Sequence, residues 1–297
     1  MGNAERSFLD TGLDFSTEDF DPDEQAAMLA WYADVHDVGD LDLAPFARFW
    51  IKNDPGGFKR LKRHILTLES EAGGVTLPVA AGVLMHVFTY TAIGNGKGAL
   101  YEIIAARTLG ASKPEILETL RLAALTCGPS GMNPLGAIAE GYMDEWTEHD
   151  ATGLRWPVGW APDVGAFRSD LDPSTDELSD EEVARVVGWH ERMHGEVPVH
   201  VATLARLHPT AYKTHRLRYE LAFTGALPAQ LVPLLDLHLA VNRRWPEAAR
   251  RAVQMARALG VRRHQVVTTL FWGASSGGEA ALEGAVAAVA DLLDDMS

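Results

Sequence analysis

Residues 77–110 of this chain read LPVAAGVLMHVFTYTAIGNGKGALYEIIAARTLG, and residues 227–260 read LPAQLVPLLDLHLAVNRRWPEAARRAVQMARALG. Each stretch opens with Leu-Pro, continues as a long apolar run and ends in Ala-Arg-x-Leu-Gly. Proline suits the first turn of a helix, and glycine suits the residue after its end. Each stretch therefore predicts two successive helices, and the offset of 150 residues predicts that the chain contains one structural unit twice.

The similarity extends toward the N-terminus of both stretches. Residues 13–18, LDFSTE, recur as residues 171–176, LDPSTD, at an offset of 158. Two short deletions account for the change from 158 to 154 and then to 150. Further matched pairs are Trp31 with Trp189, His36 with His194, and Pro55 with Pro209. We interpret this pattern as a tandem duplication.

The helical pattern covers both copies, and no strand pattern competes with it. In the first copy we expect helices at about residues 23–37, 44–52, 56–71, 78–93, 97–109, 113–126 and 132–147. Ser112-Lys113-Pro114-Glu115 is typical of a helix N-cap with proline in the first turn, and Gly110 is typical of a helix stop. The predicted fold class is all-α, with two helical bundles related by a pseudo-twofold axis.

Glycine, proline and tryptophan are concentrated between the two copies, which is typical of a connector. We place a first repeat at residues 1–147, a connector at 148–168 and a second repeat at 169–297.

Composition narrows the possible partners and surroundings. A net charge of −15 argues against a nucleic acid, because binding to a phosphate backbone depends largely on lysine and arginine. With a single cysteine, Cys127, the chain has no intrachain disulfide and no multi-cysteine metal site. Neither an export signal nor a long uncharged apolar segment is evident, so we expect a cytoplasmic protein without membrane contact.

The order of these features resembles the carboxymuconolactone decarboxylase family, which includes the alkylhydroperoxidase D-like proteins. A Leu-Pro helix start is followed by a helix ending in Ala-Arg-x-Leu-Gly and by a helix that Ser112 opens in the first copy. The resemblance covers about residues 55–145 and 205–292. It implies an all-helical homo-oligomer acting either as a decarboxylase or lactone-handling enzyme or as a disulfide-using peroxidase.

The peroxidase branch of that family carries Cys-x-x-Cys followed by x-x-x-His. The matching positions here are Asn95, Gly98 and Glu102 in the first copy, and Trp245, Ala248 and Ala252 in the second. Both redox pairs are missing, and Cys127 lies a whole helix later. We therefore do not expect thiol peroxidase activity, and Cys127 fits the role of a small residue at a helix end.

Polar residues that could support chemistry are concentrated in the first copy. Gly82, His86 and Tyr90 are spaced by four, so they share one helix face. Asn95 and Glu102 lie seven residues apart on the next element. The equivalent set in the second copy, Asp236, Ala240, Trp245 and Ala252, holds one ionisable group.

These four side chains are the candidate catalytic residues. His86 and Glu102 suit a proton donor or acceptor, while Tyr90 and Asn95 suit hydrogen-bond donors to a developing oxyanion. Lys97, on a glycine-rich turn, could pair with a substrate carboxylate. The helix-end residues Thr126 and Cys127 complete the candidate substrate-binding set.

Each candidate also has a structural interpretation. A histidine on an apolar helix is often a hydrogen-bonded core residue. Glu102 is the stronger candidate, because a charge inside the apolar stretch Tyr101 to Ala106 is rarely buried without a partner.

The histidines and the arginines of the second copy form two sets of basic residues, and we interpret neither set as a binding site. The histidines that suggest a metal site fall on at least three different elements, and they are His190, His194, His200, His208 and His215. His190 and His194 have the i, i+4 spacing of a zinc pair, but no His-Glu-x-x-His string accompanies them, and we expect no metal. For the arginines we favour a solvated helix surface over anion binding. They are Arg243, Arg244, Arg250, Arg251, Arg257, Arg262 and Arg263.

Our leading hypothesis is a cofactor-free lyase, decarboxylase or isomerase acting on a small carbonyl compound or organic acid, with its site in the first repeat. The alternative is a non-catalytic oligomeric binding or scaffold protein that has lost the family's redox chemistry. A closed pocket containing His86 and Glu102 would favour the enzyme. Apolar side chains filling that space would favour the scaffold.

Overall fold

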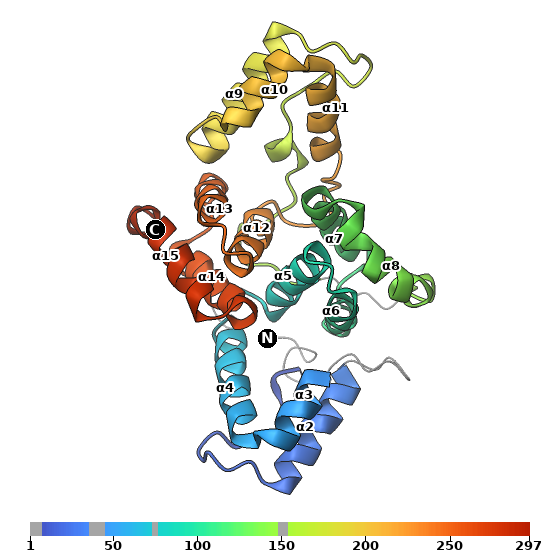
Figure 1. Cartoon of the computed structure of the whole chain (residues 1–297), viewed down its shortest axis with the longest axis vertical. Coiled ribbons are helices and arrows are strands. Elements are labelled where there is room, and N and C mark those ends of the chain that lie inside the picture. The colour runs from blue at the N-terminus through green and yellow to red at the C-terminus, as the bar shows by residue number, and fades with distance from the viewer. Residues whose placement is uncertain (1–7, 36–44, 73–76, 148–153) are drawn as a thin grey trace. The chain divides into compact units, whose positions relative to one another are not determined.

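The computed structural model describes residues 8–35, 45–72, 77–147 and 154–297. Across these residues the regular elements are α-helices and a short 3-10 helix, Val164–Phe167 (η2), with no β-strand (Figure 1). The expected all-α class is confirmed. His36 and residues 148–153 of the expected connector lie outside the described residues.

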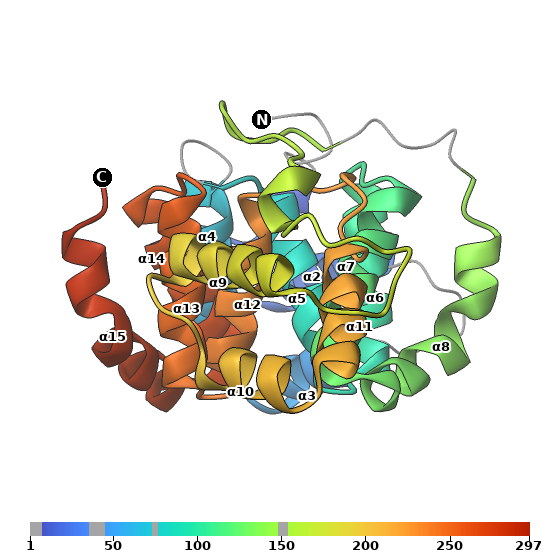
Figure 2. The same cartoon turned by 90° about the horizontal axis from the view of Figure 1, so that it is seen from above.

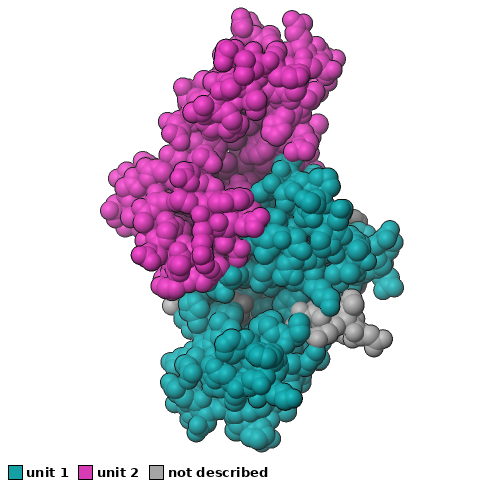
Figure 3. All heavy atoms as spheres, viewed as in Figure 1, with its two compact units in different colours: residues 1–157, 274–276 teal, residues 158–273, 277–297 magenta. Residues whose placement is uncertain are grey.

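The chain divides into two compact units (Figure 3). Unit 1 comprises residues 1–157 and 274–276, and unit 2 comprises residues 158–273 and 277–297. The helices of unit 1 are α2 (Pro22–Val35), α3 (Pro45–Asn53), α4 (Pro55–Ala72), α5 (Val79–Ala92), α6 (Gly96–Thr108), α7 (Lys113–Cys127) and α8 (Pro129–Asp144). Those that follow are α9 (Asp180–His194), α10 (Val199–Leu207), α11 (Pro209–Glu220), α12 (Leu231–Asn242), α13 (Pro246–Ala258), α14 (Arg263–Gly277) and α15 (Glu279–Asp294).

The helix bounds repeat along the chain at the offsets found in the sequence. Helices α6, α7 and α8 begin and end 150 residues before α13, α14 and α15, and α3 begins and ends 154 residues before α10. Helix α9 begins 158 residues after α2. The two units thus share one order of elements.

Local sequence signals set the helix ends. Ser112 caps α7 in a capping box with Glu115, and Pro114 lies in the first turn. Gly110 and its counterpart Gly260 have φ of 97° and 76°, in the left-handed region that glycine adopts without a Cβ clash. The expected cap and stop are confirmed.

Helix α5 forms the centre of unit 1 and packs against α6, α7 and α8 (Figure 2). Its sequence is apolar around the whole circumference, which is typical of a helix buried on all sides. Gly96 lets α6 approach α8 closely, because a Cβ at this position would overlap the backbone of Pro134.

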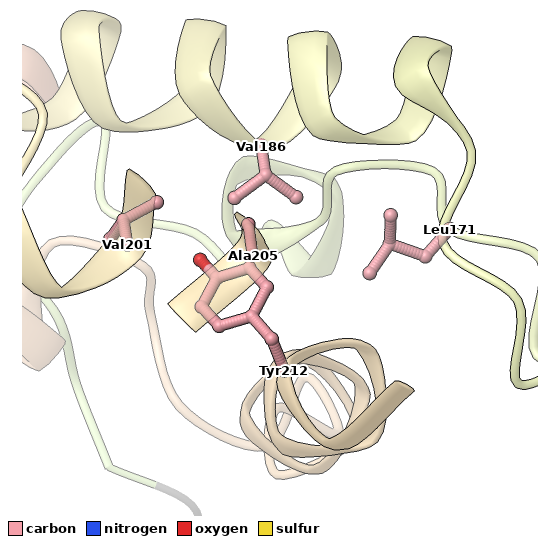
Figure 4. Close-up of a cluster of buried hydrophobic side chains, with 5 residues drawn as sticks. All are labelled: Leu171, Val186, Val201, Ala205 and Tyr212. Atoms are coloured by element: carbon pink, nitrogen blue, oxygen red, sulfur yellow. The ribbon is translucent and has the colours of Figure 1, made fainter. Parts of the chain in front are cut away.

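In unit 2, α9, α10 and α11 enclose a small apolar core (Figure 4). It consists of Leu171, Val186, Val201, Ala205 and Tyr212.

Each unit also contains a buried lysine whose ammonium donates to a glutamate carboxylate. In unit 1 Glu24 lies 2.9 Å from Lys59 Nζ, and in unit 2 Glu182 lies 2.9 Å from Lys213 Nζ. The carboxylates also accept backbone N–H groups, from Asp14 at 2.7 Å and from Asp172 at 2.9 Å. These networks occupy equivalent positions and tie the segment before each first helix to the helix itself.

Candidate functional site

The central helix of unit 1 is buried at every position except two. Within α5 only His86 and Tyr90 are partly exposed, and all other residues of the helix are buried. The two lie one turn apart, and their ring centroids are 5.5 Å apart. The expectation that they share a face is confirmed, and on this face α5 is partly exposed to solvent.

His86 is neutral at neutral pH. Burial lowers its pKa to about 4, because a charged imidazolium loses hydration there, and a hydrogen bond to the backbone of Gly82 opposes the shift only in part. Donation from one ring nitrogen to that carbonyl selects a tautomer in which the second nitrogen carries a lone pair. His86 is therefore a neutral base at neutral pH, and burial makes it weaker than a solvated imidazole.

Tyr90 is held in its protonated form. Burial raises the pKa of its phenol, and the nearby charge of Glu102 raises it further. Among the described residues no side chain or backbone group is hydrogen-bonded to the Tyr90 hydroxyl, and that oxygen is not among the fully enclosed polar atoms. It can therefore donate a hydrogen bond to a bound molecule.

Glu102 lies on α6, which packs alongside α5. Its side chain is half-buried, although the residues that follow it, Ile103 to Ala106, are fully buried. Its carboxylate is near enough to act electrostatically on the phenol of Tyr90. The structure thus brings together three of the predicted side chains: His86, Tyr90 and Glu102.

Asn95 has a structural role that the sequence interpretation did not assign. It is the N-cap of α6, and its side-chain oxygen accepts the N–H of Gly98 at 3.0 Å. Its backbone N–H donates to the carbonyl of Tyr90 at 2.8 Å, which fixes the turn between α5 and α6. The side chain is exposed, with its oxygen already engaged.

The remaining predicted residues lie at the edges of this region. Lys97 is exposed on the first turn of α6, and Thr126 is exposed near the end of α7, where its hydroxyl donates to the carbonyl of Leu122 at 3.3 Å. No hydrogen bond or ion pair within the described chain joins Lys97, Thr126 or Cys127 to His86, Tyr90 or Glu102.

Cys127 ends α7, as expected, and is half-buried. Its sulfur lies beside Gly131, where a Cβ would overlap the thiol and approach the carbonyl oxygen of Thr91 to 2.8 Å. Burial raises the pKa of the thiol, so the nucleophilic thiolate is disfavoured.

Unit 2 has a titratable group at the position equivalent to His86. Asp236 is the one residue between Leu231 and Val241 of α12 that is not buried. Burial of its surroundings raises the pKa of this carboxyl to about 7, and its charge raises the pKa of Tyr219, for which burial is the larger cause. The sequence interpretation treated this copy as plain. A lone aspartate inside LVPLLDLHLAV was the available signal, of the same kind that singled out Glu102.

The arginines of α13 and the preceding turn mostly match a solvated surface. Arg250 pairs with Asp291 at 2.7 Å and Arg257 with Asp295 at 3.6 Å, and all four side chains are well exposed. Arg251 differs, because it is half-buried and forms no ion pair with any described residue.

The described residues contain no group of three or more His, Cys, Asp or Glu side chains placed to hold a metal ion. None of their helices is long and apolar enough to span a membrane. In the comparisons with known proteins, no family model, no curated protein and no solved structure matches this chain.

Proposed function

We propose that unit 1 is a cofactor-independent lyase, decarboxylase or isomerase that acts on a small carbonyl compound or organic acid by proton transfer. The observation that carries the proposal is the partial exposure of two titratable side chains on α5. A helix otherwise buried exposes one imidazole and one phenol with ring centroids 5.5 Å apart, and the charge of Glu102 acts on the phenol. Perturbed titratable groups gathered at one exposed point are typical of functional sites.

The three side chains have complementary proton-transfer roles. His86, neutral at neutral pH, accepts a proton from the carbon next to a carbonyl group, and the electron pair moves onto the carbonyl oxygen to form an enolate. Tyr90 donates a hydrogen bond to that oxygen. Glu102 is the second group that can take up or return a proton. Return of the proton to another atom gives an isomer. When the bond that breaks joins carbon to a carboxylate, carbon dioxide leaves and a proton is added to the enolate.

The test uses the first step that these reactions share. The full-length protein is incubated in D2O with a panel of small keto acids, β-keto acids and lactones. Proton NMR follows both the loss of α-hydrogen signals and the appearance of product. We expect catalysed exchange or turnover of at least one compound.

Glu102→Gln keeps the shape of the side chain and removes its charge and its proton exchange, so we expect the rate to fall by roughly 10²–10⁴-fold. Tyr90→Phe removes one hydrogen-bond donor, and we expect a smaller loss. Glu140→Gln on α8 changes charge at an exposed site and serves as the matched control. A Glu102→Gln protein that turns over substrate normally but melts at lower temperature would show a structural partner instead. Absence of exchange with every compound would favour the scaffold alternative.

Cys127 is outside the proposed proton-transfer group. Cys127→Ser should leave turnover within a few-fold of wild type, because the thiol is protonated and the chain has no second cysteine to form a disulfide. Loss of turnover with a retained fold would identify the thiol as a nucleophile.

We also propose that the two units arose by duplication of one helical unit similar to the carboxymuconolactone decarboxylase family, and that the protein is a homo-oligomer. The recurrence of helix bounds at the sequence offsets supports the duplication. Sedimentation equilibrium of the full-length chain tests the oligomer. A monomer across the accessible concentration range would contradict it.

A further inference from the structure

Unit 2 contains a cluster of basic side chains that has no part in the reaction proposed for unit 1. On α9 the face that begins with Val186 in the apolar core continues one and two turns later as His190 and His194. Both imidazoles are more than nine-tenths buried, and their ring centroids lie 5.6 Å apart. A helix face that changes from apolar side chains to a pair of imidazoles calls for a binding or structural explanation.

Positive groups from three other helices act on this pair. Arg216 of α11 lowers the pKa of both imidazoles, His200 of α10 lowers that of His190, and Arg251 of α13 lowers that of His194. In both cases burial is the larger cause. His215 on α11 lies close enough to be influenced by His200 and Arg216. The cluster therefore gathers cationic and potentially cationic groups from α9, α10, α11 and α13.

The acidic groups nearby only partly balance this charge. Arg216 is paired with Glu220 at 2.8 Å, and Glu196 acts weakly on His194 from an exposed position. Arg251 is half-buried and has no carboxylate partner in the described parts of the chain. A half-buried guanidinium without a counter-ion is unfavourable unless an anion or solvent meets it.

One of the two imidazoles also has a ring nitrogen without a hydrogen-bond partner among the described residues. Nδ1 of His194 lies 3.3 Å from the carbonyl oxygen of Arg251, which ties α9 to α13. Nδ1 of His190 is fully enclosed and has no hydrogen-bond partner within the described residues. Buried polar atoms are normally paired, so the enclosed nitrogen of His190 lacks a partner that folded proteins usually supply.

We propose that unit 2 binds an oxyanion, the phosphate or carboxylate group of a small molecule, between α9 and α13 at His190, His194 and Arg251, with the exposed His200 nearby. The anion would accept hydrogen bonds from the guanidinium and from imidazoles that gain a proton as it binds. Binding is thereby coupled to proton uptake. The earlier interpretation of the arginines as a solvated surface holds for Arg250 and Arg257, and Arg251 is the exception.

Sulfate is the suitable probe, because it stays a dianion well below pH 5.5, in the acid range where burial places the titration of the imidazoles. Histidine Hε1 resonances of the full-length protein are followed by NMR, over that range, in sodium sulfate and in sodium chloride of equal ionic strength. We expect sulfate to raise the midpoints of His190 and His194, and we expect it to bind more tightly as the pH falls from neutral into that range. Equal midpoints in the two salts, or an affinity independent of pH, would overturn the proposal.

Arg251→Gln should weaken sulfate binding about tenfold or more, because a charge-assisted hydrogen bond is lost. Arg206→Gln on α10 removes the same charge from an exposed position and should leave the affinity unchanged. Should Arg251→Gln fail to fold, His200→Gln alters an exposed residue and should weaken binding several-fold. Unchanged sulfate affinity in His200→Gln and in a folded Arg251→Gln would exclude the site. Repeating the titration with acetate distinguishes the sources, since tighter sulfate binding indicates a phosphate group and tighter acetate binding a carboxylate.

Discussion

Replacing Glu182 by glutamine tests the electrostatic argument where the structure defines it best. One oxygen of this carboxylate accepts the ammonium of Lys213 at 2.9 Å and the N–H of Asp172 at 2.9 Å. The other accepts the N–H of Ser179 at 3.0 Å. The side chains of Glu182 and Lys213 are 5% and 0% exposed, so water contributes little to either charge.

The size of the effect follows from the pKa of this carboxyl. Burial alone would raise it, but the hydrogen bonds from Lys213, Ser179 and Asp172 outweigh burial and hold the pKa at about 2, against an ordinary value of 4.5. At about 1.4 kcal/mol for each pH unit, this difference corresponds to roughly 3 kcal/mol. Breaking a buried ion pair by removing one partner typically costs about 3–5 kcal/mol, which agrees.

The sign of the pH dependence is set by the lowered pKa. Above about pH 4.5 the carboxyl is ionised in both the folded and the unfolded chain, and its full contribution to stability is present. Between pH 4.5 and 2 the unfolded chain takes up a proton before the folded one, so the contribution is lost as the pH falls.

Urea unfolding of the full-length protein measures the effect. At pH 7 we expect Glu182→Gln to lower the free energy of unfolding of unit 2 by roughly 3 kcal/mol, and at pH 3 by less than half of that. Glu181→Gln is the control, since it removes a charge from the same first turn of α9 at an exposed position. Glu24→Gln makes the matching change in unit 1. A loss within 1 kcal/mol of the Glu181→Gln value, or a loss as large at pH 3 as at pH 7, would refute the reasoning.

Three further changes have defined outcomes. Arg244→Gly should raise the free energy of unfolding by about 1 kcal/mol, because Arg244 has a φ of 55°, in the left-handed region that favours glycine. Gly94→Ala, at the counterpart position with a φ of 77°, should lower it by a similar amount. Urea midpoints that move the other way would contradict the backbone strain at Arg244. Gly96→Ala should cost about 1–3 kcal/mol in the same assay, because a Cβ would overlap the backbone where α6 meets α8, and a neutral result would show that α8 moves freely. Acid should destabilise unit 2 below about pH 6.5, where the unfolded chain protonates His190 while burial holds its folded pKa at about 3. His190→Gln should flatten the decline of melting temperature between pH 7.5 and 5.5, and an unchanged slope would exclude this cause.

Patterns that act over a few residues made the fold class and most helix bounds predictable from the sequence. The Ser112 cap, the stops at Gly110 and Gly260 and the apolar run of α5 are local properties, since a cap involves atoms three residues apart and a helix face repeats every three to four residues. The contact between His86 and Tyr90 followed from the same helical spacing.

Contacts between elements decided which candidate residues meet. Glu102 acts electrostatically on Tyr90 because α6 packs alongside α5, whereas Lys97, five residues earlier on the same helix, forms no bond to this group in the described structure. Asn95 was a candidate by position, and the tertiary structure assigned its oxygen to the start of α6.

Burial and long-range charge were likewise decided only by tertiary structure. Glu182 and Lys213 pair although they lie 31 positions apart on different helices, and the cluster at His190 contains residues of four helices. Sequence spacing carries no information about such distances, because they depend on how the helices pack. Desolvation, the first cause of the shifts at His86, Asp236 and His190, depends on the atoms that enclose a side chain, and these come from elements distant in the sequence.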